Sequence, residues 1–115
     1  MSNRAAVRAL TVFGVSATLA GTAVLGASPA LADTDVVSFD SGAIHATPAL
    51  GGRVVGSVIP GHHYTGQCWT TGDLVNDHGT SNRNWVRLKL SNGGTGYVSA
   101  LHLKGNDKGN VPNHC

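Results

Sequence analysis

The most informative part of the chain is residues 84–98, which read NWVRLKLSNGGTGYV. Apolar residues at 86, 88 and 90 alternate with the residues between them, which is the period of two expected for a strand with one buried face. An Asn-Gly pair at 92–93 follows, and such pairs close tight hairpins because both positions tolerate positive φ. The stretch therefore predicts a β-hairpin whose second strand begins near Thr95.

Working outward from this hairpin, the sequence shows short extended runs separated by turn residues. Residues 36–39, 43–46, 53–59 and 62–71 read as strands, residues 72–82 as a polar excursion, and residues 99–103 as the end of the regular part. No window has an amphipathic period of 3.6 residues, as a helix would require. Five or six short strands at close spacing predict an all-β fold, a small barrel.

Residues 1–32 differ in character from the rest of the chain. They begin with Arg4 and Arg8, continue without charge from Ala9, and end in the small-x-small sequence of residues 30–32. This arrangement predicts a secretory signal peptide that is cleaved before Asp33. A membrane-spanning helix is the alternative, but the glycine, serine and threonine content and Pro29 favour export. We expect residues 33–115 to form a single secreted domain with no membrane segment.

The charge of the chain argues against a nucleic-acid partner. Eight basic and six acidic residues give the full chain a formal charge of +2, but two of the basic residues lie in the leader. Residues 33–115 therefore carry six of each sign and are formally neutral with neutral histidines. A strongly basic nucleic-acid binder is not indicated.

Cys68 and Cys115 are the two cysteines of the chain. In an oxidising compartment such a pair most often forms one disulfide, which here would tie back the polar tail of residues 105–115. The alternative is a catalytic or redox thiol, and the sequence has no C-x-x-C motif to support it. We expect the disulfide to contribute roughly 4 kcal/mol by restricting the unfolded chain.

Four segments together carry a resemblance to a known family: IHATP at 44–48, RVVGSVIPG at 53–61, WVRL at 85–88 and GGTGYVS at 93–99. They resemble the bacterial SH3-like (SH3b) domain over about residues 40–104, and the chain is most similar to the small secreted actinobacterial type with one disulfide. That similarity also supports the pairing of Cys68 with Cys115. His45 stands where the family pattern usually has arginine, and Thr47 stands where it usually has glycine.

The resemblance implies a non-catalytic module, extracellular or associated with the cell wall, that holds peptidoglycan peptides in an aromatic-lined groove. The candidate ligand-binding residues are His45, Tyr64, Trp85 and Tyr97. A second hypothesis is a secreted effector or inhibitor that binds an extracellular protein through its loops, and a third is a purely structural surface protein. We expect a monomer.

The remaining chemistry in the sequence does not indicate an enzyme. His62 and His63 are adjacent and would point to opposite faces of a strand, and the other histidines are scattered without chelating spacing. The sequence contains neither a nucleophile elbow nor a phosphate-binding loop. We therefore expect no metal, no cofactor and no catalytic residue.

Overall fold

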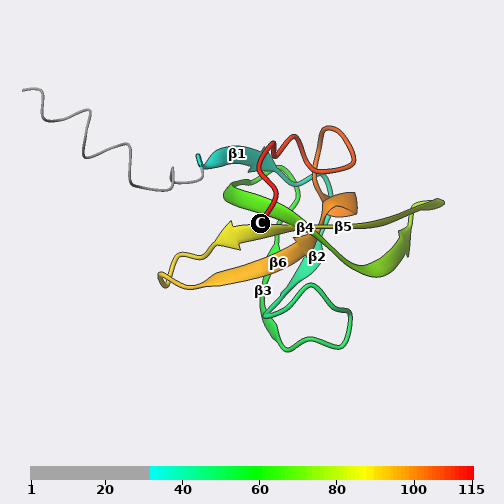
Figure 1. Ribbon diagram of the computed structural model, residues 1–115, viewed down its shortest axis with the longest axis horizontal. Helices are drawn as coiled ribbons and strands as arrows, with labels where there is room; N and C mark the ends of the chain where they lie inside the picture. Colours follow the sequence, from blue (N-terminus) through cyan, green and yellow to red (C-terminus); the bar gives the residue numbers. More distant parts are fainter. Residues whose placement is uncertain (1–31) are drawn as a thin grey trace, which may run out of the picture. The chain divides into compact units, whose positions relative to one another are not determined.

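The computed structural model describes residues 32–115, which form an all-β unit of six antiparallel strands (Figure 1). Apart from Ala32, the predicted signal peptide lies outside these described residues. Within residues 32–115 there is no helix with the length and apolar character needed to cross a membrane. The prediction of an all-β fold with five to six strands is confirmed.

The strands form a single curled sheet, and the end of the first strand also bonds to residues 102–104 through the Lys104 N–H and the Val37 carbonyl. In chain order they are β1 (Thr34–Val37), β2 (Gly42–His45), β3 (Val54–Val58), β4 (His63–Asp77), β5 (Thr80–Lys89) and β6 (Thr95–Ser99), followed by the 3-10 helix η2 (Ala100–His102). Their order in the sheet is β1-β4-β5-β6-β2-β3. Because β1 and β3 are the terminal strands of this order, the sheet makes a half-barrel rather than a closed one (Figure 1).

The hairpin expected at residues 84–98 is present. β5 pairs with β6 from Trp85↔Ser99 to Lys89↔Thr95, and the Leu90 N–H donates to the Gly94 carbonyl at 2.8 Å across the turn. Gly93 has a φ of 89°, so a residue without Cβ suits this turn position. The sequence period also sets the faces, since Val86 and Leu88 point into the core.

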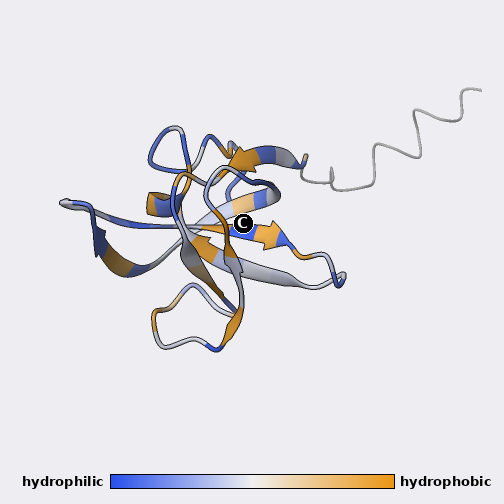
Figure 2. Cartoon of the chain, turned by 180° about the vertical axis from the view of Figure 1, so that it is seen from behind, coloured by the Kyte–Doolittle hydropathy of each residue, from blue (hydrophilic) through white to orange (hydrophobic). Residues whose placement is uncertain are grey.

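Residues 72–82 are not a separate excursion, and this part of the prediction was wrong. They extend β4 and β5 into a long hairpin that turns at His78 and Gly79, both with positive φ (51° and 74°). The distal part of this hairpin is mostly hydrophilic, with one hydrophobic band (Figure 2). Both of its faces are largely solvated, so the alternation that identifies a half-buried strand is weak there.

Residues 99–103, which we expected to end the regular part of the chain, contain the 3-10 helix η2. Ser99 caps η2, and its Oγ accepts a hydrogen bond from the Leu101 N–H at 3.2 Å. Serine is well suited to this position because its hydroxyl satisfies a backbone donor of the first turn.

The hydrophobic core lies inside the curl of the sheet and draws on β1, β2, β3, β5, β6 and the tail, while Tyr64 and Trp69 of β4 pack against it. Its buried members are Val36, Ile44, Val58, Val86, Leu88, Val98, Ala100, Leu103 and Val111. Most are β-branched or small, which is typical of a thin β core with few aromatic side chains.

The C-terminal tail is part of the fold. Cys68 and Cys115 form a disulfide with a Cα–Cα distance of 4.9 Å, so the predicted pairing is confirmed. On either side of it, the Trp69 N–H donates to the Asn113 carbonyl and the Cys115 N–H donates to the Trp69 carbonyl, both at 2.8 Å. Together with the burial of Val111, these contacts hold the end of the chain against β4.

Candidate functional site

A groove of about 550 Å³ lies between β3, the first residues of β4 and the end of β5. Its floor is apolar and continuous with the core, and it is formed by Ile44, Val55, Tyr64 and Leu90. Its rim is polar and is formed by Ser57, His63, Thr65, Lys89, Ser91 and Asn92. An apolar floor with a few polar groups around it is the usual composition of a ligand site.

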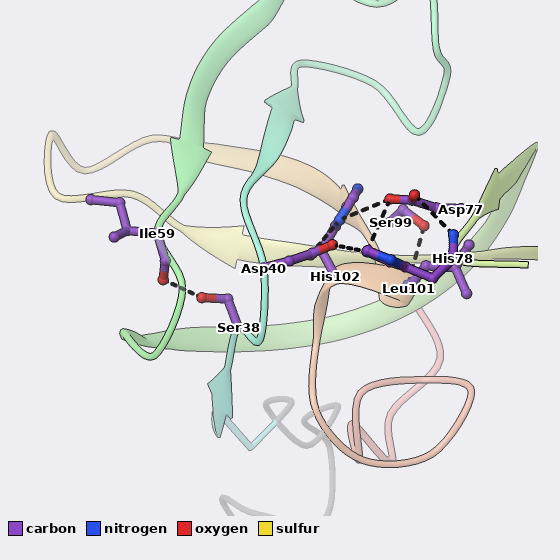
Figure 3. A network of polar contacts seen from close by, with 8 residues as sticks. All are labelled: Ser38, Asp40, Ile59, Asp77, His78, Ser99, Leu101 and His102. Carbon is purple, nitrogen blue, oxygen red and sulfur yellow. Dashed lines mark hydrogen bonds and ion pairs between the residues drawn. The ribbon is translucent and has the colours of Figure 1, made fainter. Parts of the chain in front are cut away.

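Tyr64 is the aromatic residue of this groove and is held in a fixed position. Its hydroxyl accepts a hydrogen bond from the Ile59 N–H at 2.8 Å, and its ring packs against the core. The Ile59 carbonyl in turn accepts a hydrogen bond from the buried Ser38 hydroxyl (Figure 3). These contacts fix the turn after β3 and therefore the wall of the groove.

The rim carries two basic side chains in exposed ion pairs. Lys89 Nζ lies 3.1 Å from Asp33 Oδ2, and His63 Nδ1 lies 2.8 Å from Asp35 Oδ2. Exposed pairs of this kind contribute only about 0–1 kcal/mol. A carboxylate of a ligand can therefore compete with Asp33 for the Lys89 ammonium, and with Asp35 for the hydrogen bond of His63, at little cost.

The groove also borders a free strand edge. β3 is a terminal strand of the sheet, and its consecutive residues 55–57 all line the groove. Val55 and Ser57 point to the same face, and Gly56 between them can contribute only backbone atoms, so the groove reaches the backbone of this strand. An edge strand presents N–H and C=O groups that an extended peptide can pair with.

Of the residues expected to bind a ligand, the other three lie away from this groove. His45 and Trp85 are in edge-to-face contact with ring centroids 5.6 Å apart, and Tyr97 pairs across the strands with His45 and with Arg87. Trp85 is 1% exposed, and its indole N–H donates to the Asp73 carbonyl at 3.0 Å. His45 is also buried, with Nδ1 2.8 Å from the Gly52 carbonyl oxygen. The fold therefore brings His45, Trp85 and Tyr97 together and leaves Tyr64 apart.

The loop of residues 46–53 explains the burial of Trp85. Trp85 alternates with the core residue Val86 and so belongs to the opposite face of the sheet, which the loop covers. The Asp73 N–H donates to the Pro48 carbonyl at 3.1 Å, and a Cβ at Gly72 would lie 2.1 Å from that oxygen and 2.8 Å from Trp85 Cδ1. A ligand contact at Trp85 does not fit this placement, and the loop that carries Thr47 does not line the groove.

A group of ionisable side chains gathers at the opposite end of the long hairpin. Asp40 follows β1, Asp77 ends β4, His78 opens the hairpin turn, and His102 ends η2 (Figure 3). Asp40 contacts both histidines: Oδ2 contacts His78 Nε2, and Oδ1 lies 2.8 Å from His102 Nδ1. Sequence reasoning missed this cluster because the members are up to 62 residues apart, and no local spacing could have revealed it.

The electrostatics of this cluster favour its charged forms. Burial raises the pKa of Asp40, but the hydrogen bonds and charges of His78 and His102 outweigh it, so the pKa lies below its ordinary 3.8. The hydrogen bond to Asp40 and the nearby Asp77 carboxylate raise the pKa of His78 above its ordinary 6.5. Each partner thus stabilises the ionised form of the other.

Comparison of the chain with protein-family models, with curated proteins and with solved structures gave no match. The resemblance to SH3b domains therefore rests on the sequence motifs, and it remains a hypothesis about the fold family and the ligand.

Proposed function

We propose that this protein is a secreted, non-catalytic SH3-like binding module that recognises short peptides of cell-wall peptidoglycan. The observation that carries the proposal is the groove beside β3, which combines an apolar floor, a polar rim and a free strand edge. The SH3b-like motifs of the sequence support the same class of ligand.

The groove suits an extended peptide with small side chains and free carboxylates. Its volume of about 550 Å³ is in the range of sites for small ligands. A peptide backbone would pair with residues 55–57, alternate side chains would contact Tyr64 and Leu90, and a carboxylate would meet Lys89 at the rim. The stem peptides of peptidoglycan have this chemistry.

A second candidate function is the binding of another protein, as an effector or inhibitor. Val54 and Ile59 flank β3 at its two ends and are 57% and 50% exposed. An edge strand with exposed apolar residues at both ends is a suitable surface for strand addition by a protein partner. The two hypotheses share β3 and differ in the partner.

Pelleting of the purified, oxidised chain with insoluble peptidoglycan over a salt series tests the proposal. We expect binding that persists at high salt, because the floor and the strand edge do not depend on charge. Ser57→Glu places a carboxylate on the exposed rim and should reduce pelleting by about tenfold, equivalent to ~1.4 kcal/mol.

Thr71→Glu is the matched control, since it adds the same charge at an exposed strand position that does not line the groove. Equal losses in both variants would remove the groove from the proposal. Failure of the unmodified chain to pellet would contradict wall binding and favour a protein partner.

A further inference from the structure

We propose that Asp40, Asp77, His78 and His102 form a zinc-binding site. The site lies at the far end of the β4–β5 hairpin and shares no residue with the groove beside β3. It therefore stands independently of the proposed wall binding, and it replaces the expectation from the sequence that the histidines bind no metal.

Ligand atoms of Asp40, Asp77 and His78 all lie within 4.8 Å of one another, and His102 borders this group through Asp40 and Asp77. His78 Nε2 and His102 Nδ1 lie 3.7 Å and 3.9 Å from Asp77 Oδ2, and His102 Nδ1 lies 2.8 Å from Asp40 Oδ1. In a tetrahedral site with bonds of about 2.0–2.1 Å, neighbouring donor atoms are roughly 3.3 Å apart. These three separations change by only about 0.6 Å or less to reach that value, whereas His78 Nε2 and Asp40 Oδ2 are in direct contact and would have to move further apart as the ion enters between them.

The types of donor favour zinc over the common hard cations. Two imidazole nitrogens and two carboxylate oxygens are all established zinc ligands. Calcium takes six to eight oxygen ligands, and magnesium also prefers oxygen. With two carboxylates and two imidazoles, the cluster has fewer oxygen ligands than either ion prefers, and half of its side chains offer nitrogen instead.

The surrounding backbone holds the two histidines in place. A Cβ at position 42 would lie 2.5 Å from His102 Cδ2, so Gly42 is what makes room for this ring. His78 has a φ of 51°, and its N–H donates to Asp77 Oδ1 at 2.9 Å, which leaves Asp77 Oδ2 nearest to the imidazoles. The His102 side chain is 14% exposed and that of His78 is 55% exposed, so an ion has access from the hairpin side.

Four protein ligands make a closed site, which is the arrangement of structural rather than catalytic zinc. Bound zinc would join the β1–β2 connection, the tip of the long hairpin and η2. This cross-link would stabilise one end of the half-barrel, while the disulfide ties the tail to β4.

The test is a calorimetric titration of Zn²⁺ into the metal-free, oxidised chain, followed by thermal unfolding with and without the ion. We expect one zinc per chain, a higher Tm with zinc, and no such rise with Ca²⁺. Replacement by Co²⁺ should give the visible absorption of a tetrahedral cobalt centre. No zinc uptake by the unmodified chain would overturn the proposal.

His78→Asn is the informative variant, because asparagine tolerates positive φ and keeps the turn while removing a ligand. It should weaken zinc binding at least about tenfold. Asp77→Asn should also weaken zinc binding at least about tenfold, because it removes the carboxylate ligand at the end of β4. His62→Asn, which removes an exposed histidine outside the cluster, should leave the affinity unchanged. Zinc uptake that survives both ligand substitutions would also contradict the site.

Discussion

The rings of His45 and Trp85 are in edge-to-face contact, with centroids 5.6 Å apart, on the face of the sheet opposite the main core. The backbone carbonyl of Asp73 accepts a hydrogen bond from the indole N–H, and the loop of residues 46–53 covers the two rings. These contacts form a second, smaller buried cluster outside the main core. Trp85 is therefore a structural residue and not part of the surface.

Trp85→Ala should therefore destabilise the protein by about 3–5 kcal/mol, as large-to-small substitutions of buried aromatic residues do. Trp85→Phe keeps most of the buried area and leaves the Asp73 carbonyl without its donor, so we expect a smaller loss of about 1–3 kcal/mol. Equilibrium unfolding in urea measures both values. A change below 1 kcal/mol for the alanine variant would show that the loop does not bury this side chain in solution.

Gly42→Ala should destabilise the protein by about 1–3 kcal/mol, because the new methyl group meets the His102 ring. Gly51→Ala is the matched control, since nothing lies within 4 Å of a Cβ at that position. We expect Gly51→Ala to be neutral or slightly stabilising through the unfolded state. Thermal unfolding of the two variants side by side distinguishes the close approach at Gly42 from a general effect of alanine.

Loss of the disulfide should cost about 2–5 kcal/mol, whether by reduction or by the paired Cys68→Ser and Cys115→Ser substitutions. The tail that the bond anchors supplies Val111 to the core, so part of the loss comes from weaker packing there. Proteolysis should then cut near residues 105–110 in the reduced chain before it cuts the strands. A reduced chain with unchanged stability and protease resistance would show that the tail holds without the bond.

The Asp40–His78 pair predicts a pH dependence of stability in metal-free protein kept in a chelator. The pKa of His78 is raised in the fold, so its stabilising contribution is complete below pH 6.5 and is lost as the pH rises through the higher folded value. The pKa of Asp40 is lowered, so its contribution is present above pH 3.8 and is lost as the pH falls through the lower folded value.

Thermal unfolding across pH, with His78→Asn for comparison, checks the expectation for His78. The decline in stability of the unmodified chain above pH 6.5 should be smaller in the variant, which has no imidazole at this position. The same slope in both chains would mean that His78 does not interact with Asp40 in solution.

Local patterns were sufficient to predict the all-β class, the 84–98 hairpin and the disulfide. The alternation at residues 86–90 acts through immediate neighbours, and the turn at Gly93 depends on one or two φ angles. The two cysteines left only one possible intramolecular bridge. The groove was predictable only in part, through Tyr64.

Contacts between distant segments decided the rest. Trp85 has the alternation of a surface position and is buried because His45, the Gly72–Asp73 segment and the loop of residues 46–53 pack around it. Asp40, Asp77, His78 and His102 meet because β1, the long hairpin and η2 end in the same region of space. Periodicity in a sequence reports which face of one strand is apolar, and it contains no information about which loop covers the other face or which chain ends converge.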